Sequence, residues 1–485
     1  MSTIEVASYA AGWQAAWPGL VVGIAALLAM GADLLSRGPD RDGVAVVGVL
    51  GLLAAVVVSA GAWGSDLAGF QNTLRADRFG LFFTILLCTG AALAMLMSIE
   101  FVREQRLPAG DYHALLLLST CGMVFMALAN DLIVVFLGLE IMSMAVYVLA
   151  GILRGDARSS EAAMKYFVLG AFASGFLLYG IAFFYGATGS TRLDVIAQTI
   201  ATQGVSPFVM LGIAFVTVGF GFKVALVPFQ AWTPDVYEGA PTAITAFMAV
   251  GVKAAAFAAL ARLFFTGLHG VAEHWSGLLA VLAVLTMTVG NVLAVSQQSV
   301  KRMLAYSSIA HAGYALVGVV IATRDGGAAL CFYLTTYAFM NLGAFGVLLA
   351  LARRGEPHET LGDLAGVGWR QPLLGVAMVV CMLSLAGMPP TAGFVGKFWV
   401  FSAAIDAGYV GLVIAGVLNS LVSVYYYLGV LVQMYMVEGQ APLAPPVRRP
   451  WLLSVILVAV AGTLLLGVLP SSPMELARQA FASLR

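Results

Sequence analysis

Four ionisable residues interrupt long apolar stretches of the sequence: Glu140, Lys223, Lys253 and Lys397. Lys253 and Lys397 lie near the middle of their stretches, Lys223 lies within GFKVALVPF, and the glutamate stands alone in LGLEIMSMAVYVL. At mid-bilayer such a charge costs about 2.5–3.5 kcal/mol on insertion scales and is usually functional. Lysine and glutamate can exchange protons when burial and neighbouring charges adjust their affinity, whereas arginine essentially never releases its proton. These residue types therefore predict a path for protons.

The alternative to a proton path is that these residues only hold helices together. The evidence for a transport role over a structural one differs between residues. One acid cannot neutralise three deep lysines in fixed pairs, which favours function for the four residues above. Lys165 lies only a few residues into its run, so a packing ion pair or a snorkelling side chain fits as well as a transport role. His311, in SSIAHAGYALVG, suits either a hydrogen-bonded core histidine or a proton relay. Lys301, next to Arg302, is expected to be an ordinary loop charge.

Composition places these residues in a membrane protein. The chain has 485 residues, of which 61% are hydrophobic and 10% charged, against about 25% charged in soluble domains. The net charge of zero gives no indication of nucleic-acid binding. The four cysteines are far apart and form no Cys/His cluster, and only one histidine lies well inside an apolar run. We therefore expect no metal site, no haem and no other cofactor in this chain, so that any redox chemistry belongs to a partner.

The apolar stretches predict an all-α polytopic membrane protein, because backbone groups in lipid must be satisfied within each spanning segment. Stretches of about 20 apolar residues are long enough to span. Fourteen candidates are found, at 16–36, 43–62, 79–100, 112–129, 131–153, 162–187, 207–229, 241–266, 275–295, 303–323, 328–352, 372–405, 408–436 and 450–470. The first nineteen residues contain no Lys or Arg, so we expect the first stretch to be retained as a spanning helix rather than cleaved as a signal peptide.

The positive charges of the loops predict the orientation. Thirteen Lys or Arg residues fall in odd-numbered loops and seven in even-numbered loops and the C-terminus. The odd loops should then face the cytoplasm, and both termini should lie on the outer side.

A short internal echo suggests a repeat. G-F-x-x-K occurs at 219–223 and again at 393–397, in each case in an apolar segment broken by Gly or Pro. Broken segments at corresponding places in two halves are typical of transport proteins with sites at mid-membrane. Five helices separate the two copies, so the repeats would be inverted. The break beside Lys223 is expected to bring water to its ammonium group, because irregular backbone is tolerated only next to protein or water.

Several motifs closely resemble subunit N, an antiporter-like membrane subunit of proton-pumping NADH:quinone oxidoreductase (respiratory complex I) of the bacterial type. The motifs are FKVALVPFQAWTPDVYEGAP, LGLEIMSMAVYVLAG, SVKRMLAYSSIAHAGYALVG and SLAGMPPTAGFVGKFWVF, in a resemblance that runs from about residue 79. It implies fourteen helices with two inverted five-helix repeats, each containing a broken helix. The corresponding parts are 1–111 (helices 1–3), 112–266 (first repeat), 275–436 (second repeat) and 437–485 (helix 14).

By this resemblance, Glu140 and Lys223 form the input pair, Lys253 is the central relay and Lys397 the output lysine. Lys165 and His311 match charged or polar positions near the path. Gln230 stands where many relatives have histidine, so that histidine cannot be essential for titration here.

The resemblance implies a proton-translocating subunit in the bacterial inner membrane, with the other membrane subunits of complex I as partners, especially the neighbouring antiporter-like and small membrane subunits. Quinone reduction elsewhere in the complex would supply the energy, so the chain takes part in an enzyme without redox chemistry of its own. Two alternatives stay open: a subunit of a multisubunit sodium/proton antiporter, and a structural scaffold that does not pump. A solute transporter fits less well, because no further polar constellation of substrate size is found.

Overall fold

The computed structural model describes residues 3–36, 41–352, 359–439 and 449–484. The long helices are α1 (Thr3–Leu35), α2 (Asp42–Gly61), α3 (Arg78–Glu104), α4 (Ala109–Leu128), α5 (Leu132–Ala150), α6 (Ala157–Thr188), α8 (Pro207–Val224), α12 (Ser276–Val295), α13 (Val300–Val320), α14 (Arg324–Leu351), α16 (Pro372–Ala386), α17 (Ala392–Asp406), α18 (Val410–Met436) and α19 (Pro450–Val468). One further spanning helix, Thr242–Gly267, consists of α10 (Thr242–Phe247), the π-helical η1 (Met248–Val252), α11 (Lys253–Arg262) and the π-helical η2 (Leu263–Gly267).

Shorter elements connect these helices. They are the antiparallel strands β1 (Leu67–Gly69) and β2 (Leu74–Ala76), the helices α7 (Leu193–Gln203), α9 (Trp232–Gly239), α15 (Val367–Arg370) and α20 (Ser471–Ala482), and the 3-10 helices η3 (His269–His274) and η4 (Gly362–Leu364).

The expectation of an all-α membrane protein with about fourteen spans and a broken helix is confirmed. In the described residues, thirteen helices are long and apolar enough to cross a membrane, or up to fourteen if the strongly bent pair Gly362–Arg370 and Pro372–Ala386 is one span. The predicted twelfth segment, 372–405, is divided into α16 and α17 by the residues between Ala386 and Ala392. Pro389 and Pro390 lie in this interval and lack the backbone N–H groups that would continue the helix.

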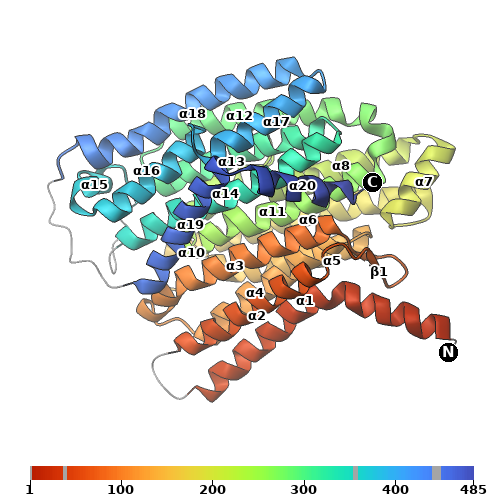
Figure 1. The fold of residues 1–485 in the computed structure, drawn as a ribbon, viewed down its shortest axis with the longest axis horizontal. Helices are drawn as coiled ribbons and strands as arrows, with labels where there is room; N and C mark the ends of the chain where they lie inside the picture. The colour runs from red at the N-terminus through yellow and green to blue at the C-terminus, as the bar shows by residue number, and fades with distance from the viewer. Residues whose placement is uncertain (1–2, 37–40, 353–358, 440–448, 485) are drawn as a thin grey trace.

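The loops gather on two opposite faces according to their order in the chain. On the odd-loop face, Val300 donates a backbone hydrogen bond to Glu359, and Leu361 donates one to Gln298. On the even-loop face, Asn130 and Leu132 donate to the carbonyls of Thr73 and Thr191. Figure 1 places α15 at the left end of the bundle and α7, the β1 hairpin and the C-terminus at the right end. Odd-numbered and even-numbered loops therefore lie on opposite faces, as the count of loop charges assumed. The assignment of the odd-loop face to the cytoplasm stays a prediction.

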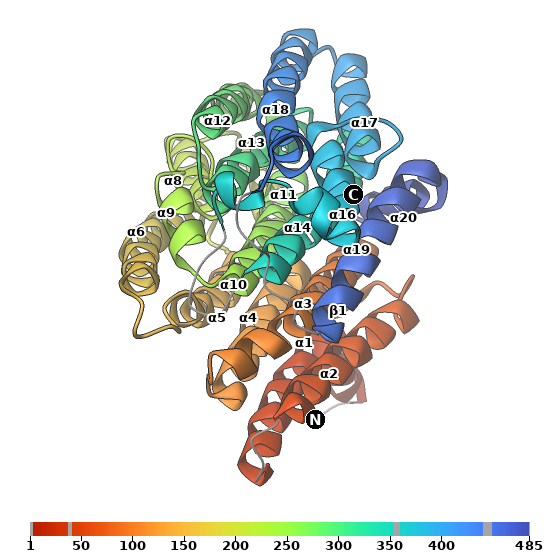
Figure 2. The same ribbon diagram turned by 90° about the vertical axis from the view of Figure 1, so that its left-hand side faces the viewer.

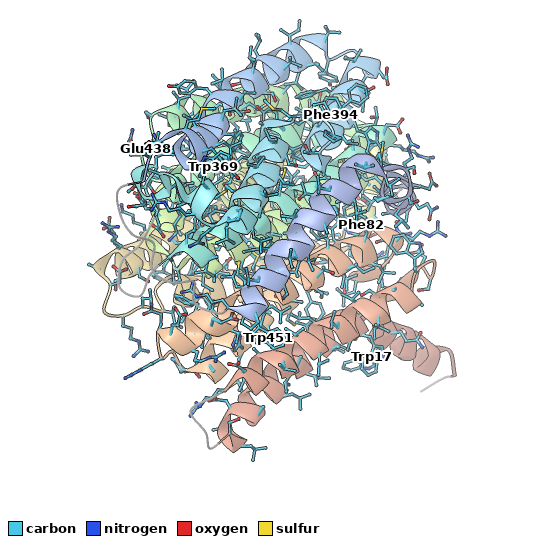
Figure 3. All side chains as sticks on the ribbon, turned by 60° about the vertical axis from the view of Figure 1, so that its left-hand side comes forward. Trp17, Phe82, Trp369, Phe394, Glu438 and Trp451 are labelled. Atoms are coloured by element: carbon cyan, nitrogen blue, oxygen red, sulfur yellow. The ribbon has the colours of Figure 1, made fainter. Side chains whose placement is uncertain are left out.

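The helices form one elongated bundle in which sequence order runs broadly from one side to the other. Helices α1 and α2 lie at one edge and α18 at the opposite edge, with α14 near the middle (Figures 1 and 2). Large apolar side chains cover the outside, and Trp17 and Trp369 are 47% and 75% exposed (Figure 3). An exterior of this kind suits contact with lipid or with other membrane subunits.

Two features at the ends of the chain go beyond the sequence-based expectations. Helix α20 follows α19 within the part expected to hold helix 14 alone, and its Phe481 ring packs 4.6 Å from Phe265 and 6.1 Å from Phe79. The twelve-residue helix is amphipathic and too short to span, which is why a search for long apolar stretches misses it. Part of the loop-charge count lies outside the described residues, namely Arg37, Arg353, Arg354, Arg448 and Arg485.

Candidate functional site: a row of buried ionisable groups

Lys223 lies in the last turn of α8 and is 2% exposed. Its ammonium group donates to Ser143 Oγ at 2.7 Å and to Tyr147 Oη at 3.2 Å, both on α5. The Tyr147 and Tyr166 rings lie 5.2 and 5.4 Å from Nζ, within the range of cation–π attraction. Hydroxyl groups and ring faces thus surround a desolvated cation.

Glu140 lies on the same face of α5 as these two hydroxyls, since positions three and seven residues apart are neighbours on a helix. Its Oε1 atom accepts a hydrogen bond of 2.6 Å from Ser174 on α6. Glu140 and Lys223 form no direct salt bridge in the described structure: the glutamate accepts from Ser174, and the lysine donates to Ser143, three residues after the glutamate on the same helix. Ser143 and Tyr147 were not predicted from the sequence as partners of Lys223, although their spacing of three and seven residues from Glu140 places them on the same helix face.

The chain break after Lys223 is stabilised by side chains of the protein. Ala225 adopts a left-handed conformation with φ of 63°, and α8 ends there. Trp232 Nε1 donates to the Phe222 carbonyl at 2.9 Å, and the Val227 N–H donates to Thr286 Oγ1 at 3.0 Å. Hydration is therefore not needed to satisfy these backbone groups, and access of water to the lysine stays a prediction.

Lys253 follows the π-helical turn η1 and is 3% exposed. Turns of this kind often occur at functional sites, because the extra residue re-aims the side chains that follow it. The ammonium group donates to the backbone carbonyl of Ser308 on α13. The ring of Tyr337, on α14, lies 5.8 Å from Nζ.

His311 lies at the centre of a cluster of tyrosines and is 2% exposed. Its Nδ1 atom is 2.7 Å from Tyr333 Oη and its Nε2 atom is 3.2 Å from Tyr427 Oη, so both ring nitrogens have hydroxyl partners. The rings of Tyr337 and Tyr314 lie 5.2 and 5.6 Å from the imidazole. Burial with both nitrogens hydrogen-bonded is compatible with a core histidine and with a relay, so the geometry leaves both roles open.

Lys397 lies on α17, beyond the break that separates this helix from α16, and is 5% exposed. It donates to the carbonyls of Leu385 and Ala386 at 3.0 and 3.1 Å and to Ser420 Oγ at 3.0 Å. The carbonyl groups left free by the end of α16 thus become ligands of the ammonium group.

The G-F-x-x-K echo does not mark equivalent positions relative to the two helix breaks. Lys223 precedes its break, whereas Lys397 follows the break that ends at Ala392. The inverted repeat itself stays a prediction.

Contacts between aromatic and polar side chains connect the three deep lysines in two stretches. The side chains from Lys253 to Lys397 are linked by close ring contacts through Tyr337, His311 and Tyr314, since the last ring lies 4.9 Å from the second ammonium group. Between Lys223 and Lys253 the connection is longer: ring contacts run from Lys223 through Tyr166 and Trp232 to Tyr237. Tyr237 in turn interacts with Ser308, whose carbonyl accepts the hydrogen bond from Lys253. Buried oxygen atoms without a hydrogen-bond partner include those of Tyr166, Gln230, Thr233, Ser308 and Tyr337. Such atoms are usually satisfied by internal water, which suits a hydrated passage.

Lys165 and Lys301 form ion pairs with acidic side chains, unlike Lys223, Lys253 and Lys397. The side chain of Lys165 is 40% exposed and bonds Glu161 at 2.7 Å and Asp235 at 2.6 Å. Burial opposes the charged form of Asp235, but the hydrogen bonds from Lys165 and Arg302 outweigh it and lower the pKa of this carboxyl group. Lys301 is not the exposed loop charge expected from the sequence: it is 3% exposed and bonds Glu359 at 3.2 Å, because α13 begins against the segment after residue 358.

One buried ion pair was missed altogether. Arg262 is 1% exposed and makes two hydrogen bonds of 2.7 Å to the carboxylate of Asp77. Asp77 also caps α3 through the Gly80 N–H. Nothing in the local sequence signals this contact between residues 185 positions apart.

Comparison with known proteins places this geometry in a family. A family model described as NADH:quinone oxidoreductase/Mrp antiporter, TM, matches residues 129–423. The chain is 47% identical over 463 residues to NADH-quinone oxidoreductase subunit N of Trichlorobacter lovleyi, covering 95% of this chain and 94% of the relative. It is 44% identical over 460 residues to subunit N 1 of Herpetosiphon aurantiacus, covering 93% of both chains.

Solved structures agree with the sequence comparison. A chain of respiratory complex I from Thermus thermophilus with bound Aureothin matches with a TM-score of 0.81 and 35% identity, covering 94% of this chain and 98% of that chain. The Mrp complex from Dietzia sp. DQ12-45-1b matches with a TM-score of 0.83 but 23% identity, covering 100% of this chain and 98% of that one, which indicates a shared fold alone. The long relatives and the family model together show that this chain belongs to the subunit N family of NADH-quinone oxidoreductases.

Proposed function

We propose that the chain carries protons across the bilayer as the antiporter-like subunit N of an NADH-quinone oxidoreductase. The observation that carries this proposal is the environment of Lys223, Lys253 and Lys397. Each ammonium group is at least nine-tenths buried, and none pairs with a carboxylate of the described residues. Their partners are hydroxyl and carbonyl oxygens. A lysine kept for packing would resemble Lys301, whose charge is neutralised by Glu359.

The proposed path begins at Glu140 and Lys223 and continues through Lys253 to Lys397. When the carboxylate lies close, its attraction holds the proton on the first lysine. When a neighbouring subunit draws Glu140 away, the desolvated ammonium group would release its proton towards Lys253. Moving one charge against 100 mV requires about 2.3 kcal/mol, which a change of about two pKa units in one group would supply.

We assign the part of the path between Lys253 and Lys397 to His311 and the tyrosines that surround it. His311 lies between Lys253 and Lys397 and has a hydroxyl group on each ring nitrogen, so we give it the role of a relay. Lys165 is the weakest member of the predicted set, because its two acids neutralise it at the surface of α6.

The energy would come from quinone reduction in another subunit, and we expect no cofactor in this chain. The outward side chains of α5 support a subunit contact beside Glu140, since Leu137, Ile141 and Met144 are 54%, 45% and 52% exposed. We therefore assign the partners to the other membrane subunits of the complex, with the chain in a bacterial inner membrane and both termini outside.

The sodium/proton antiporter alternative receives less support, because identity is 47% to a subunit N and 23% to the Mrp chain. The scaffold alternative predicts that the deep lysines tolerate an apolar replacement.

The test is Lys397→Met in the assembled complex, with Arg324→Met on the even-loop face as the matched control. Proton uptake into vesicles and NADH oxidation are measured on the same preparation. We expect proton transfer through this subunit to slow by about 100-fold, while the control pumps normally. Wild-type pumping by assembled Lys397→Met would overturn the assignment.

A further inference from the structure

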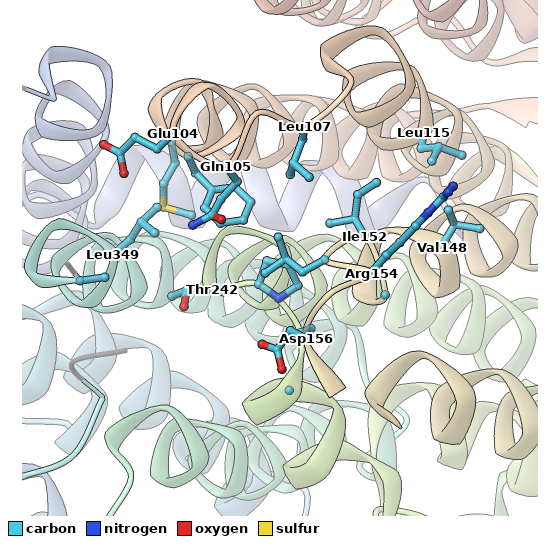
Figure 4. Close-up of a pocket in the computed structure, with 18 of the residues that line it drawn as sticks. Glu104, Gln105, Leu107, Leu115, Val148, Ile152, Arg154, Asp156, Thr242 and Leu349 are labelled. Atoms are coloured by element: carbon cyan, nitrogen blue, oxygen red, sulfur yellow. The ribbon is translucent and has the colours of Figure 1, made fainter. Parts of the chain in front are cut away.

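We propose that a cavity on the odd-loop face binds a membrane phospholipid whose headgroup carries a primary ammonium group. The cavity measures about 1160 Å³ and lies between α3, α4, the α5–α6 loop, the start of α10 and the ends of α14 and α19. Figure 4 shows the side chains that surround it, with Glu104 on one side and Leu115 and Val148 on the other. This volume is large enough for a headgroup and the upper part of its acyl chains.

A buried carboxyl group with one unpaired oxygen, that of Glu100, belongs to the inner wall of the cavity. Glu100, on α3, is 5% exposed, and its Oε1 atom accepts a hydrogen bond of 3.0 Å from the Trp451 N–H at the start of α19. Its Oε2 atom is buried and has no hydrogen-bond partner in the structure. A buried carboxylate oxygen left in this way is costly, and an N–H donor with a positive charge satisfies it best.

The mouth of the cavity presents two arginines that no acid neutralises. The guanidinium groups of Arg154 and Arg158 form no ion pair and no hydrogen bond with the described residues, although both line the cavity. Other cations in the same wall are already satisfied: Arg449 bonds Glu104 at 2.9 Å, and Lys301 bonds Glu359. Free guanidinium groups at a membrane surface are suited to bidentate hydrogen bonds with a phosphate.

Apolar side chains continue from this mouth onto the lipid-facing surface. Met30, Leu118 and Val148 line the cavity and are 44%, 37% and 54% exposed. Figure 4 shows Arg154 reaching towards Leu115 and Val148, so a phosphate held there lies beside a surface suited to acyl chains. A free inorganic anion would match the arginines alone, whereas a phosphoethanolamine lipid matches the arginines, the apolar wall and Glu100.

The test measures lipid retention and is independent of proton pumping. The intact membrane assembly containing this chain is purified, depleted of lipid in detergent, and exposed to mixed micelles of phosphatidylethanolamine, phosphatidylcholine or phosphatidylglycerol. Retained lipid is quantified by mass spectrometry. The choline headgroup has the same phosphate but no N–H, and the glycerol headgroup has no cation, so the three lipids separate the two contacts.

Three variants assign the contacts. Glu100→Gln should lower retention of phosphatidylethanolamine about ten-fold and leave phosphatidylglycerol unchanged, because Gln keeps the bond to Trp451 but loses the charge. The double variant Arg154→Gln/Arg158→Gln should lower retention of all three lipids. Glu438→Gln, at an exposed position just after the end of α18, is the control and should change nothing (Figure 3).

Two results would overturn the proposal. One is equal retention of the three lipids by the wild type with no effect of Glu100→Gln. The other is that the wild type retains no more lipid than the double arginine variant does. The cavity would then contain water rather than a lipid.

Discussion

Two buried cations on one helix allow the functional and structural roles of charge to be separated. Lys253 and Arg262 lie at the two ends of α11, and both are at most 3% exposed. Arg262 has a carboxylate partner at 2.7 Å, whereas Lys253 has only the Ser308 carbonyl. Replacing each with Met removes a charge of similar depth, but the consequences for stability and transport should be opposite.

The magnitudes follow from the partners. Lys253→Met relieves an unpaired membrane charge, worth about 2.5–3.5 kcal/mol, and loses one charged hydrogen bond, worth about 1.5–3 kcal/mol. The two terms nearly cancel, so the free energy of unfolding should stay within about 1–2 kcal/mol of the wild type. Arg262→Met leaves Asp77 buried without its partner and should cost about 3–5 kcal/mol.

The assay compares two readouts on each variant. The midpoint of thermal unfolding of the purified complex reports stability, and the ratio of protons pumped to NADH oxidised reports transport. We expect Lys253→Met to melt close to the wild type and to lose transport through this subunit. Arg262→Met should melt earlier, and the fraction that remains assembled should pump. The reasoning fails if Lys253→Met pumps at the wild-type ratio, or if Arg262→Met is as stable as the wild type.

Three further predictions concern other parts of the molecule. The pKa of Asp235 is lowered from 3.8 in the folded chain, so the stability from its ion pairs is present above about pH 4 and is lost as the pH falls through the lower folded value; Asp235→Asn should flatten the acid limb of a plot of melting midpoint against pH, and an unchanged limb would contradict this. Glu140→Gln should reduce the ratio of protons to NADH less than replacement of a deep lysine does, because Gln can still accept the bond from Ser174; a greater loss would contradict the assigned order. Gly387→Ala should lower the melting midpoint, at a cost of about 1–2 kcal/mol, because φ is 86° and the added methyl group meets Lys397 Cδ at 3.0 Å; a midpoint equal to the wild type would show that the break relaxes freely.

The sequence predicted the membrane helices well because their signal is local. Each spanning helix can be recognised from a run of about twenty apolar residues, and an ionisable residue within such a run is easily identified. The break near Lys397 could be predicted for the same reason, since Pro389 and Pro390 cannot donate backbone hydrogen bonds. Helix α20 and the amphipathic α7 (193–203) carry no such signal, because a short helix with one apolar face depends on what it packs against.

The partners of each charge could not be predicted, because they are set by contacts between distant residues. Lys301 and Lys253 are both 3% exposed, yet one pairs with an acid 58 positions away and the other with a carbonyl group 55 positions away. Lys301 had the stronger sequence argument for a surface role, being next to Arg302. The expectation of a direct pair between Glu140 and Lys223 also left out Ser143, which is near Glu140 on α5 and accepts a hydrogen bond from Lys223.

The distribution of carboxylates therefore distinguishes the two classes of buried cation better than depth does. Arg262 and Lys301 each have an acid close by, and a fixed pair of this kind holds its proton and fastens helices together. Lys223, Lys253 and Lys397 form no such direct ion pair with the described residues, and the groups that contact their ammonium groups are neutral hydroxyl and carbonyl oxygens and ring faces. A cation held in this way gives up its proton at a smaller free-energy cost than a paired one. An approaching or receding carboxylate can then control that cost, and Glu140, on the partly exposed face of α5, is the group placed to do so.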